Sequence, residues 1–293
     1  RRQRQMCIRD RVIAMGETIV MITAGIDISV GSVTALVCMV AANQMENHGA
    51  SAYTALLMAL VIGLLFGLVQ GFLVSYLEIQ PFIVTLAGMF FGRGMTSIIS
   101  TDMISIKNKT FLAWANYKIY LPIGSYSRRG KFIPAYIYPT VIIAILIFIV
   151  IAIIMKYTKF GREVYAIGGN AQSAMMMGLN VKKTKFKAYV LDGLLAGCGG
   201  FLFCLNSCSG FVEQAKGLEM DAISASVIGG TLLSGGVGTP FGTVFGVLIK
   251  GTISSLITTQ GTLSSWWVRI ALSALLCFFI VLQSIIGSMK KKN

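Results

Sequence analysis

Nine apolar runs fill most of this sequence, and their length is the feature that most restricts the fold. The runs lie at about 12–25, 29–42, 53–77, 81–100, 134–155, 188–206, 221–233, 240–259 and 265–287. A helix needs roughly 20 apolar residues to cross the hydrocarbon core of a bilayer, and several of these runs reach that length. Since helices satisfy their own backbone polar groups in lipid, we expect an all-α, polytopic helical membrane protein with about nine spans.

The low share of charged residues agrees with a membrane location and excludes other classes of protein. Only 12% of the 293 residues are charged, against 55% that are hydrophobic, whereas soluble domains carry roughly 25% charged residues. An ordinary soluble enzyme, a disordered chain and a nucleic-acid-binding domain are therefore excluded. The net charge of +14 is concentrated in the first eleven residues, the loops and the tail, as orientation in an anionic membrane requires.

The first eleven residues differ in character from everything that follows. They read RRQRQMCIRDR, with five arginines and no helical period, and they match the translated end of a transposon adapter. We therefore expect residues 1–11 to be a foreign sequence scar and residues 12–293 to form a single transmembrane domain. The alternative is a basic cytoplasmic N-terminus.

Two apolar runs, 29–42 and 221–233, are too short to cross the membrane as straight helices. The first follows the glycine-containing stretch 25–32, and the second ends in the glycine-rich stretch 229–236. Non-helical backbone at membrane depth is tolerated only where protein or a water-filled cavity covers it. The sequence therefore predicts broken helices in the centre of the bundle, lining a path.

Glycines four residues apart predict close contacts between helices. Such spacing occurs at Gly63, Gly67 and Gly71, at Gly88 and Gly92, at Gly193 and Gly197, and at Gly238, Gly242 and Gly246.

Loop charge predicts the orientation. Segment 156–187 carries seven basic residues and one acid, which favours the cytoplasm. Counting spans then puts 43–52 and 101–133 outside.

The sequence offers little for catalysis or metal binding. His48 is the only histidine, and it lies in a predicted outer loop, whereas four of the six cysteines lie inside apolar runs. We therefore expect neither a Ser-His-Asp constellation nor a His/Cys zinc site. Segment 233–236 resembles the signature of ABC ATPases, but the chain has no phosphate-binding loop. We expect no catalytic residue, no metal and no cofactor. The charged residues Glu17 and Lys250 either pair with each other or alter the path. Asp27, Asp192 and Asp221 lie near span ends, where capping or interfacial water favours structural roles for them.

Loop 156–187 contains a predicted short helix. Asn170 can cap a helix that begins at Ala171 and runs to about Met177, and Gly178 can end it in the left-handed conformation. A short cytoplasmic helix with exposed methionines is typical of a surface that enters a groove on a partner.

Four segments in order, 24–32, 81–86, 161–179 and 221–236, resemble the membrane permeases of bacterial ribose-type ABC importers, in the branched-chain amino acid/ribose permease superfamily. Segments 86–91, 229–239 and 261–267 are most similar to galactofuranose permeases. The resemblance implies a ten-helix fold, here without its first helix, in the bacterial inner membrane. It also implies a second permease chain, a cytoplasmic ABC ATPase and an external sugar-binding protein as partners.

The resemblance makes import of a monosaccharide the expected function. The alternatives are an ion-coupled secondary transporter of a small polar solute and an ABC permease for a non-sugar substrate such as branched-chain amino acids. The residues expected to couple to the ATPase are Arg162, Glu163, Asn170, Ala171, Ala174 and Gly178. Hydroxyls and rings suit a sugar, so the expected substrate path comprises Ser29, Ser32, Thr85, Phe82, Phe90, Ser226 and Thr231.

Overall fold

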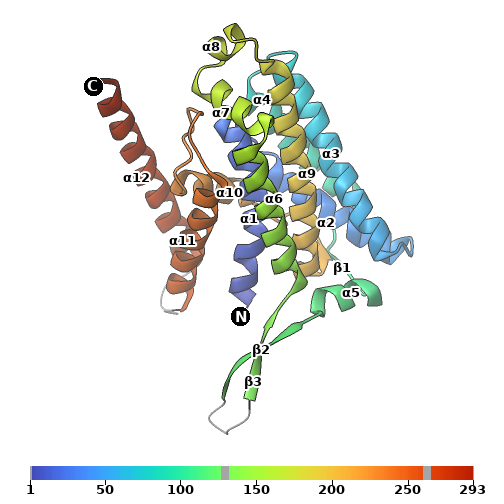
Figure 1. Ribbon diagram of the computed structural model, residues 1–293. Coiled ribbons are helices and arrows are strands. Elements are labelled where there is room, and N and C mark those ends of the chain that lie inside the picture. The colour runs from blue at the N-terminus through green and yellow to red at the C-terminus, as the bar shows by residue number, and fades with distance from the viewer. Residues whose placement is uncertain (1, 127–131, 260–264, 293) are drawn as a thin grey trace.

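Helices form almost all of the computed structural model, which describes the backbone of residues 2–126, 132–259 and 265–292 (Figure 1). The helices are α1 (Arg2–Ile22), α2 (Val30–Asn47), α3 (Ala52–Ser75), α4 (Pro81–Ile99), α5 (Lys109–Asn116), α6 (Pro139–Tyr157), α7 (Lys159–Gly169), α8 (Ala171–Met176), α9 (Val181–Ser207), α10 (Leu218–Ile228), α11 (Pro240–Thr259) and α12 (Ser265–Lys292). Residue 1 of the expected scar, 127–131 of the loop 101–133, and 260–264, where the motif 261–267 begins, lie outside the described residues.

Five described helices, α3, α4, α6, α9 and α11, are long and apolar enough to cross a membrane, and α12 contains the shorter apolar stretch Trp267–Gln283. This confirms a polytopic helical membrane protein. The run predicted at 134–155 begins later than expected, because α6 starts at Pro139. The run at 188–206 begins earlier, because α9 already starts at Val181.

The central helix of the bundle is α1, which packs against α6, α9, α10 and α11. From Val12 to Ile22 its side chains are buried. Polar contacts join it to two neighbours: the Thr18 hydroxyl lies 2.9 Å from Ser226 Oγ of α10 and 2.6 Å from Thr243 Oγ1 of α11. The hydrophobic effect does not drive helices together within lipid, so hydrogen bonds between hydroxyl groups help to hold the helices in contact.

Glycines allow the close helix contacts that their spacing predicts. A Cβ atom added to Gly67 of α3 would lie 2.7 Å from the Tyr189 carbonyl oxygen of α9, and Gly63 similarly faces the backbone of Gly193 and Gly197. On the other side of α1, Gly242 of α11 faces the backbone of Gly229 at the end of α10. Side chains at these positions would force the helices apart.

Two small antiparallel sheets were not predicted. Strands β2 (Ile119–Tyr126) and β3 (Phe132–Ile137) form a hairpin that projects from the end of the bundle opposite α8 (Figure 1). Strands β1 (Ile104–Ser105) and β4 (Ser209–Gly210) pair Ile104 with Gly210. The hairpin strands are rich in isoleucine and tyrosine, which favour pleated structure, and their apolar character merged with that of α6 in the sequence.

Candidate functional site

The two breaks predicted from glycine-rich sequence lie against each other. Residues 23–29 separate α1 from α2, and residues 229–239 separate α10 from α11. The Gly236 N–H donates to the Ile22 carbonyl at 2.9 Å. Ala24, with φ 61°, and Gly236, with φ 76°, are both left-handed. This conformation is unusual for alanine, so the backbone is strained where the breaks meet.

Helix α7 joins this pair of breaks to the predicted partner-binding helix. The Tyr165 hydroxyl donates to the Gly238 carbonyl of the second break at 2.8 Å. Gly168 packs so closely that an added Cβ would lie 2.5 Å from the Gly236 nitrogen and would also overlap the Ile22 carbonyl. A displacement of α7 must therefore reach both breaks. We call α7 and α8 together the α7–α8 arm.

The short helix predicted after Asn170 is present as α8. The Asn170 side chain accepts from the Ser173 N–H at 2.9 Å, and Gly178 follows with φ 81°, so the predicted cap and left-handed end are confirmed. The helix ends at Met176 rather than Met177. Its exposed side chains include those of Met175 and Met176, at 63% and 78% exposure.

The remaining coupling candidates face different ways. Ala174 is fully buried, so it packs against the protein instead of presenting a surface. A charge substituted at Ala174 would therefore be buried without a partner, which is costly. Ala171 is half-buried and Arg162 exposed, whereas Glu163 accepts from the Thr184 hydroxyl of α9 at 2.8 Å. The arm therefore contacts α9 through Glu163.

Three of the predicted path residues gather around the first break, with their hydroxyls already bonded. Ser29 Oγ accepts from Gln70 Nε2 at 2.8 Å, and Ser32 Oγ donates to the Ser29 carbonyl at 2.7 Å. Thr85 Oγ1 lies 3.0 Å from the Pro81 carbonyl, within its own helix. All three side chains are buried. A substrate would have to compete with these bonds.

The other predicted path residues lie elsewhere. Ser226 belongs to the hydroxyl cluster between α1, α10 and α11, while Phe82 and Phe90 project from α4 with 48% and 65% exposure. Thr231 lies in the second break, fully buried, and its hydroxyl has no hydrogen-bond partner among the described residues. The structure thus divides the seven candidates among at least three places.

A cluster of buried carboxyl groups escaped the sequence reasoning. Glu17 of α1, Asp27 of the first break and Asp192 of α9 are all buried and interact with one another. The Asp27 N–H donates to Glu17 Oε1 at 3.2 Å, and Asp27 Oδ1 accepts from the Ser29 N–H at 2.7 Å. The Asp192 carboxyl group lies within hydrogen-bonding reach of the Asp27 carboxyl group. We call these three residues the carboxyl cluster.

The carboxyl cluster decides one open alternative. Asp192 lies within α9, which begins at Val181. Glu17 does not contact Lys250, whose ammonium lies 2.9 Å from Asp221 Oδ2. Carboxylates gathered in a low-dielectric interior repel one another, so the cluster is an energetically costly arrangement. Sequence separation hides the cluster, since nothing local links Asp27 to Asp192.

Comparison with known proteins assigns the chain to a family. The family described as "Branched-chain amino acid transport system / permease component" matches residues 11–281. The inner membrane ABC transporter permease protein YjfF of Escherichia coli K12 is 42% identical over 274 residues, which cover 93% of this chain and 79% of that protein.

More distant relatives extend the comparison. The ribose import permease protein RbsC of Escherichia coli K12 and the fructose import permease protein FruG of Bifidobacterium longum are each 33% identical over 273 residues. Those residues cover 93% of this chain, 81% of RbsC and 78% of FruG. No solved structure matches. The chain therefore belongs to the branched-chain amino acid transport system / permease component family, as a multi-pass inner-membrane permease of the ABC-importer type, a transport component rather than an enzyme.

Proposed function

We propose that this permease imports a monosaccharide, galactofuranose-like or ribose-like, and that its partners are a cytoplasmic ABC ATPase, an external sugar-binding protein and a second permease chain. The observation that carries this proposal is the bond between Tyr165 and Gly238, which links the α7–α8 arm to the broken helices. Relatives named for ribose and fructose import support a sugar. The specific similarity to galactofuranose permeases remains a prediction.

The proposed topology places the α7–α8 arm in the cytoplasm and the β2–β3 hairpin outside. The two lie at opposite ends of the bundle (Figure 1), as loop charge predicts for segment 156–187. In this topology the nine apolar segments cross or enter the membrane. The 18-residue α2 follows the first break, and the 11-residue α10 precedes the second.

The proposed substrate path runs past the two breaks. Thr231 is the strongest of the predicted contacts, because its buried hydroxyl has no partner among the described residues and can bond a sugar without losing a bond to the protein. Thr231→Val keeps the shape and removes the hydroxyl. We expect slower sugar transport from Thr231→Val, whereas Thr252→Val on exposed α11 surface transports at the parent rate. Equal rates would remove Thr231 from the path.

The proposed docking of the α7–α8 arm into a groove of the ATPase rests on the exposed methionines of α8. Met176→Glu places a charge on the docking surface and, because Met176 is 78% exposed, leaves packing intact. We expect it to abolish stimulation of the ATPase in the reconstituted importer. Met103→Glu is the control, since Met103 is 61% exposed and directly precedes β1, which lies far from α8 in Figure 1. Normal stimulation in Met176→Glu would reject the docking surface.

The carboxyl cluster gives one alternative, ion-coupled transport, a specific basis. Proton relays in transporters use buried carboxyl groups such as those of Glu17, Asp27 and Asp192. Reconstitution separates the two mechanisms: we expect uptake to need ATP and the ATPase, and to ignore an imposed pH gradient. Uptake by the chain alone, driven by that gradient, would favour ion coupling. Competition by leucine but not by sugars would favour the branched-chain amino acid alternative.

A further inference from the structure

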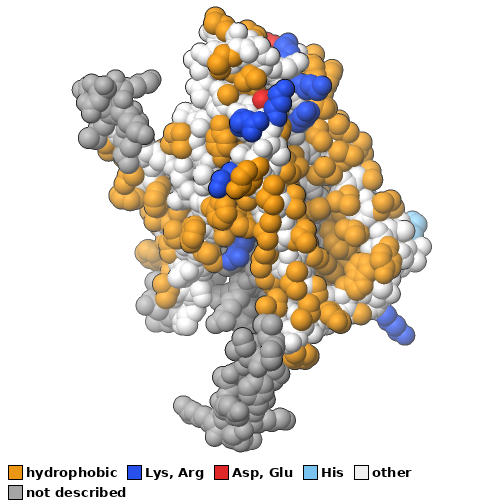
Figure 2. Space-filling view, in the orientation of Figure 1, with side chains coloured by type: hydrophobic (Ala, Val, Ile, Leu, Met, Phe, Trp, Pro, Cys, Tyr) orange, Lys and Arg blue, Asp and Glu red, His pale blue; other side chains and the backbone are white. Residues whose placement is uncertain are grey.

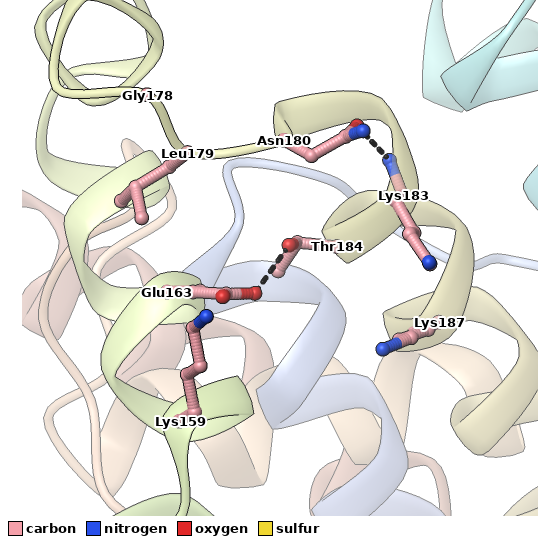
Figure 3. A pocket seen from close by; sticks show the side chains of 8 residues that line it. All are labelled: Lys159, Glu163, Gly178, Leu179, Asn180, Lys183, Thr184 and Lys187. Carbon is pink, nitrogen blue, oxygen red and sulfur yellow. Dashed lines mark hydrogen bonds between the residues drawn. The ribbon is translucent and has the colours of Figure 1, made fainter.

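A basic pocket lies beside the segment that follows α8, between α7 and the first turns of α9. Its walls include Lys159 and Glu163 of α7 and Lys183, Thr184 and Lys187 of α9, and segment 178–180 completes it (Figure 3). Its volume is about 340 Å³, which is at the lower end of the range for small-molecule sites. Neither the substrate path nor the docking of α8 uses this pocket.

The charges that line the pocket favour an anion. Lys183 and Lys187 are four residues apart and therefore lie on one face of α9, and Lys159 approaches from another helix. Glu163 is the acid of the described lining, and one of its oxygens is occupied by the Thr184 hydroxyl at 2.8 Å. The lining therefore holds three lysines against one glutamate. Like charges repel each other, and a bound anion relieves that repulsion.

Other lysines of the same segment do not line the pocket. Lys182 bonds Glu78 at 2.8 Å, and Lys185 also acts on Glu78. Lys156 lies over the Tyr157 ring at 5.3 Å. The presence of Lys159, Lys183 and Lys187 in the pocket lining is therefore specific to their positions rather than a property of every lysine near the membrane.

An apolar surface adjoins the pocket. In Figure 2, basic side chains gather on the upper part of the face, and hydrophobic side chains extend below them. Helix α6 ends two residues before Lys159, and its last two turns expose Ile149, Ile153 and Tyr157 at 49%, 50% and 67%. A ligand that carries an anionic group and hydrocarbon chains matches both surfaces at once.

We propose that the pocket binds the phosphodiester headgroup of an anionic phospholipid of the cytoplasmic leaflet, with its acyl chains along α6. The orientation rests on the proposed function, which places this end of the bundle in the cytoplasm. Because residues 178–180, between α8 and α9, line the pocket, the lipid contacts the foot of the α7–α8 arm. Headgroup binding would thus hold the arm against α9.

The test compares two double variants that remove the same charge from the same helix. Lys183→Gln/Lys187→Gln alters the pocket, whereas Lys182→Gln/Lys185→Gln leaves the pocket lining intact. Binding of phosphatidylglycerol and phosphatidylcholine to the full chain in neutral detergent is measured by native mass spectrometry. At about five-fold per lysine, we expect the pocket variant to bind phosphatidylglycerol about 25-fold more weakly, and the control variant to bind it like the parent.

Several results would overturn the proposal. Equal binding of the two lipids by the parent would show that the negative charge does not matter, and equal losses in the two double variants would reduce the effect to general surface charge. Retention of inorganic phosphate alone, with displacement of phosphatidylglycerol at millimolar phosphate, would assign the pocket to free phosphate. If adding the ATPase at a concentration equal to that of the permease releases the lipid, the pocket would be assigned to an acidic group of the ATPase.

A third variant guards against misfolding of the pocket variant. Lys159→Gln changes the pocket from α7, and we expect about a five-fold loss with an unchanged melting temperature. No loss in Lys159→Gln would contradict the proposal even if the double variant failed to fold. Because these measurements need neither ATP nor sugar, their failure is distinguishable from failure of the proposed transport function.

Discussion

The contact between α3 and α9 provides the sharpest test of how this bundle holds together, through the variant Gly67→Ala. The new Cβ would lie 2.7 Å from the Tyr189 carbonyl oxygen and 3.0 Å from the Val190 Cα, whereas ordinary contacts begin at 3.4 Å. The obstructing atoms are backbone, so the two helices must separate by about 0.7 Å, the difference between the first and the last of these distances.

A separation of this size has a calculable cost. A gap of 0.5–1 Å forfeits a quarter to a half of the attraction between facing atoms, and overpacking costs about 1–3 kcal/mol. Since rigid backbone cannot yield, we expect a packing cost of about 2–3 kcal/mol. The higher helix propensity of alanine offsets up to about 1 kcal/mol, which leaves a net loss of about 1–2 kcal/mol.

Gly94→Ala is the matched control, because a Cβ added to Gly94 of α4 meets no atom within 4 Å. The gain in helix propensity is common to both variants, so the difference between them isolates the packing cost of about 2–3 kcal/mol. Free energies of unfolding are measured by reversible denaturation with dodecyl sulfate in mixed micelles. If Gly67→Ala and Gly94→Ala are equally stable, the inferred backbone contact between α3 and α9 is wrong.

Three further predictions concern the α7–α8 arm and the loop beside it. Tyr165→Phe leaves the Gly238 carbonyl without this donor, at a cost of about 1 kcal/mol, and we expect fewer sugars transported per ATP hydrolysed, with ATPase activity retained; an unchanged ratio would contradict the link. Asn170→Ala removes the cap of α8, also at about 1 kcal/mol, so amide hydrogen exchange in α8 should rise, and unchanged exchange would argue against the cap. The hydrogen bond from Lys182 and the charge of Lys182 lower the pKa of Glu78; this contact is therefore present above the ordinary glutamate pKa and is lost as the pH falls through the lowered value. Carboxyl NMR should show the Glu78 pKa rise in Lys182→Gln, and an unchanged pKa would exclude this pairing.

Local sequence determined the class of the protein and its irregular points. Apolar runs and scarce charge identify membrane helices because the hydrocarbon core excludes charged groups. Glycines at 229–236 predicted a break, and Asn170 and Gly178 predicted the two ends of α8, because capping and left-handed conformations depend on a few adjacent residues. Glycine spacing also predicted close helix contacts, since it sets the profile of one helix face.

Tertiary structure decided which side chains meet and which face outward. The sequence gives no sign that Asp27 and Asp192 lie together or that Lys250 pairs with Asp221, because each pair joins separate helices. The sequence predicts Ala174 as a docking residue, but its side chain is buried, and the methionines form the exposed surface of α8. Burial and pairing depend on how helices pack against one another, and in a membrane nearly every helix face is apolar, so hydropathy alone cannot distinguish a face that meets protein from one that meets lipid.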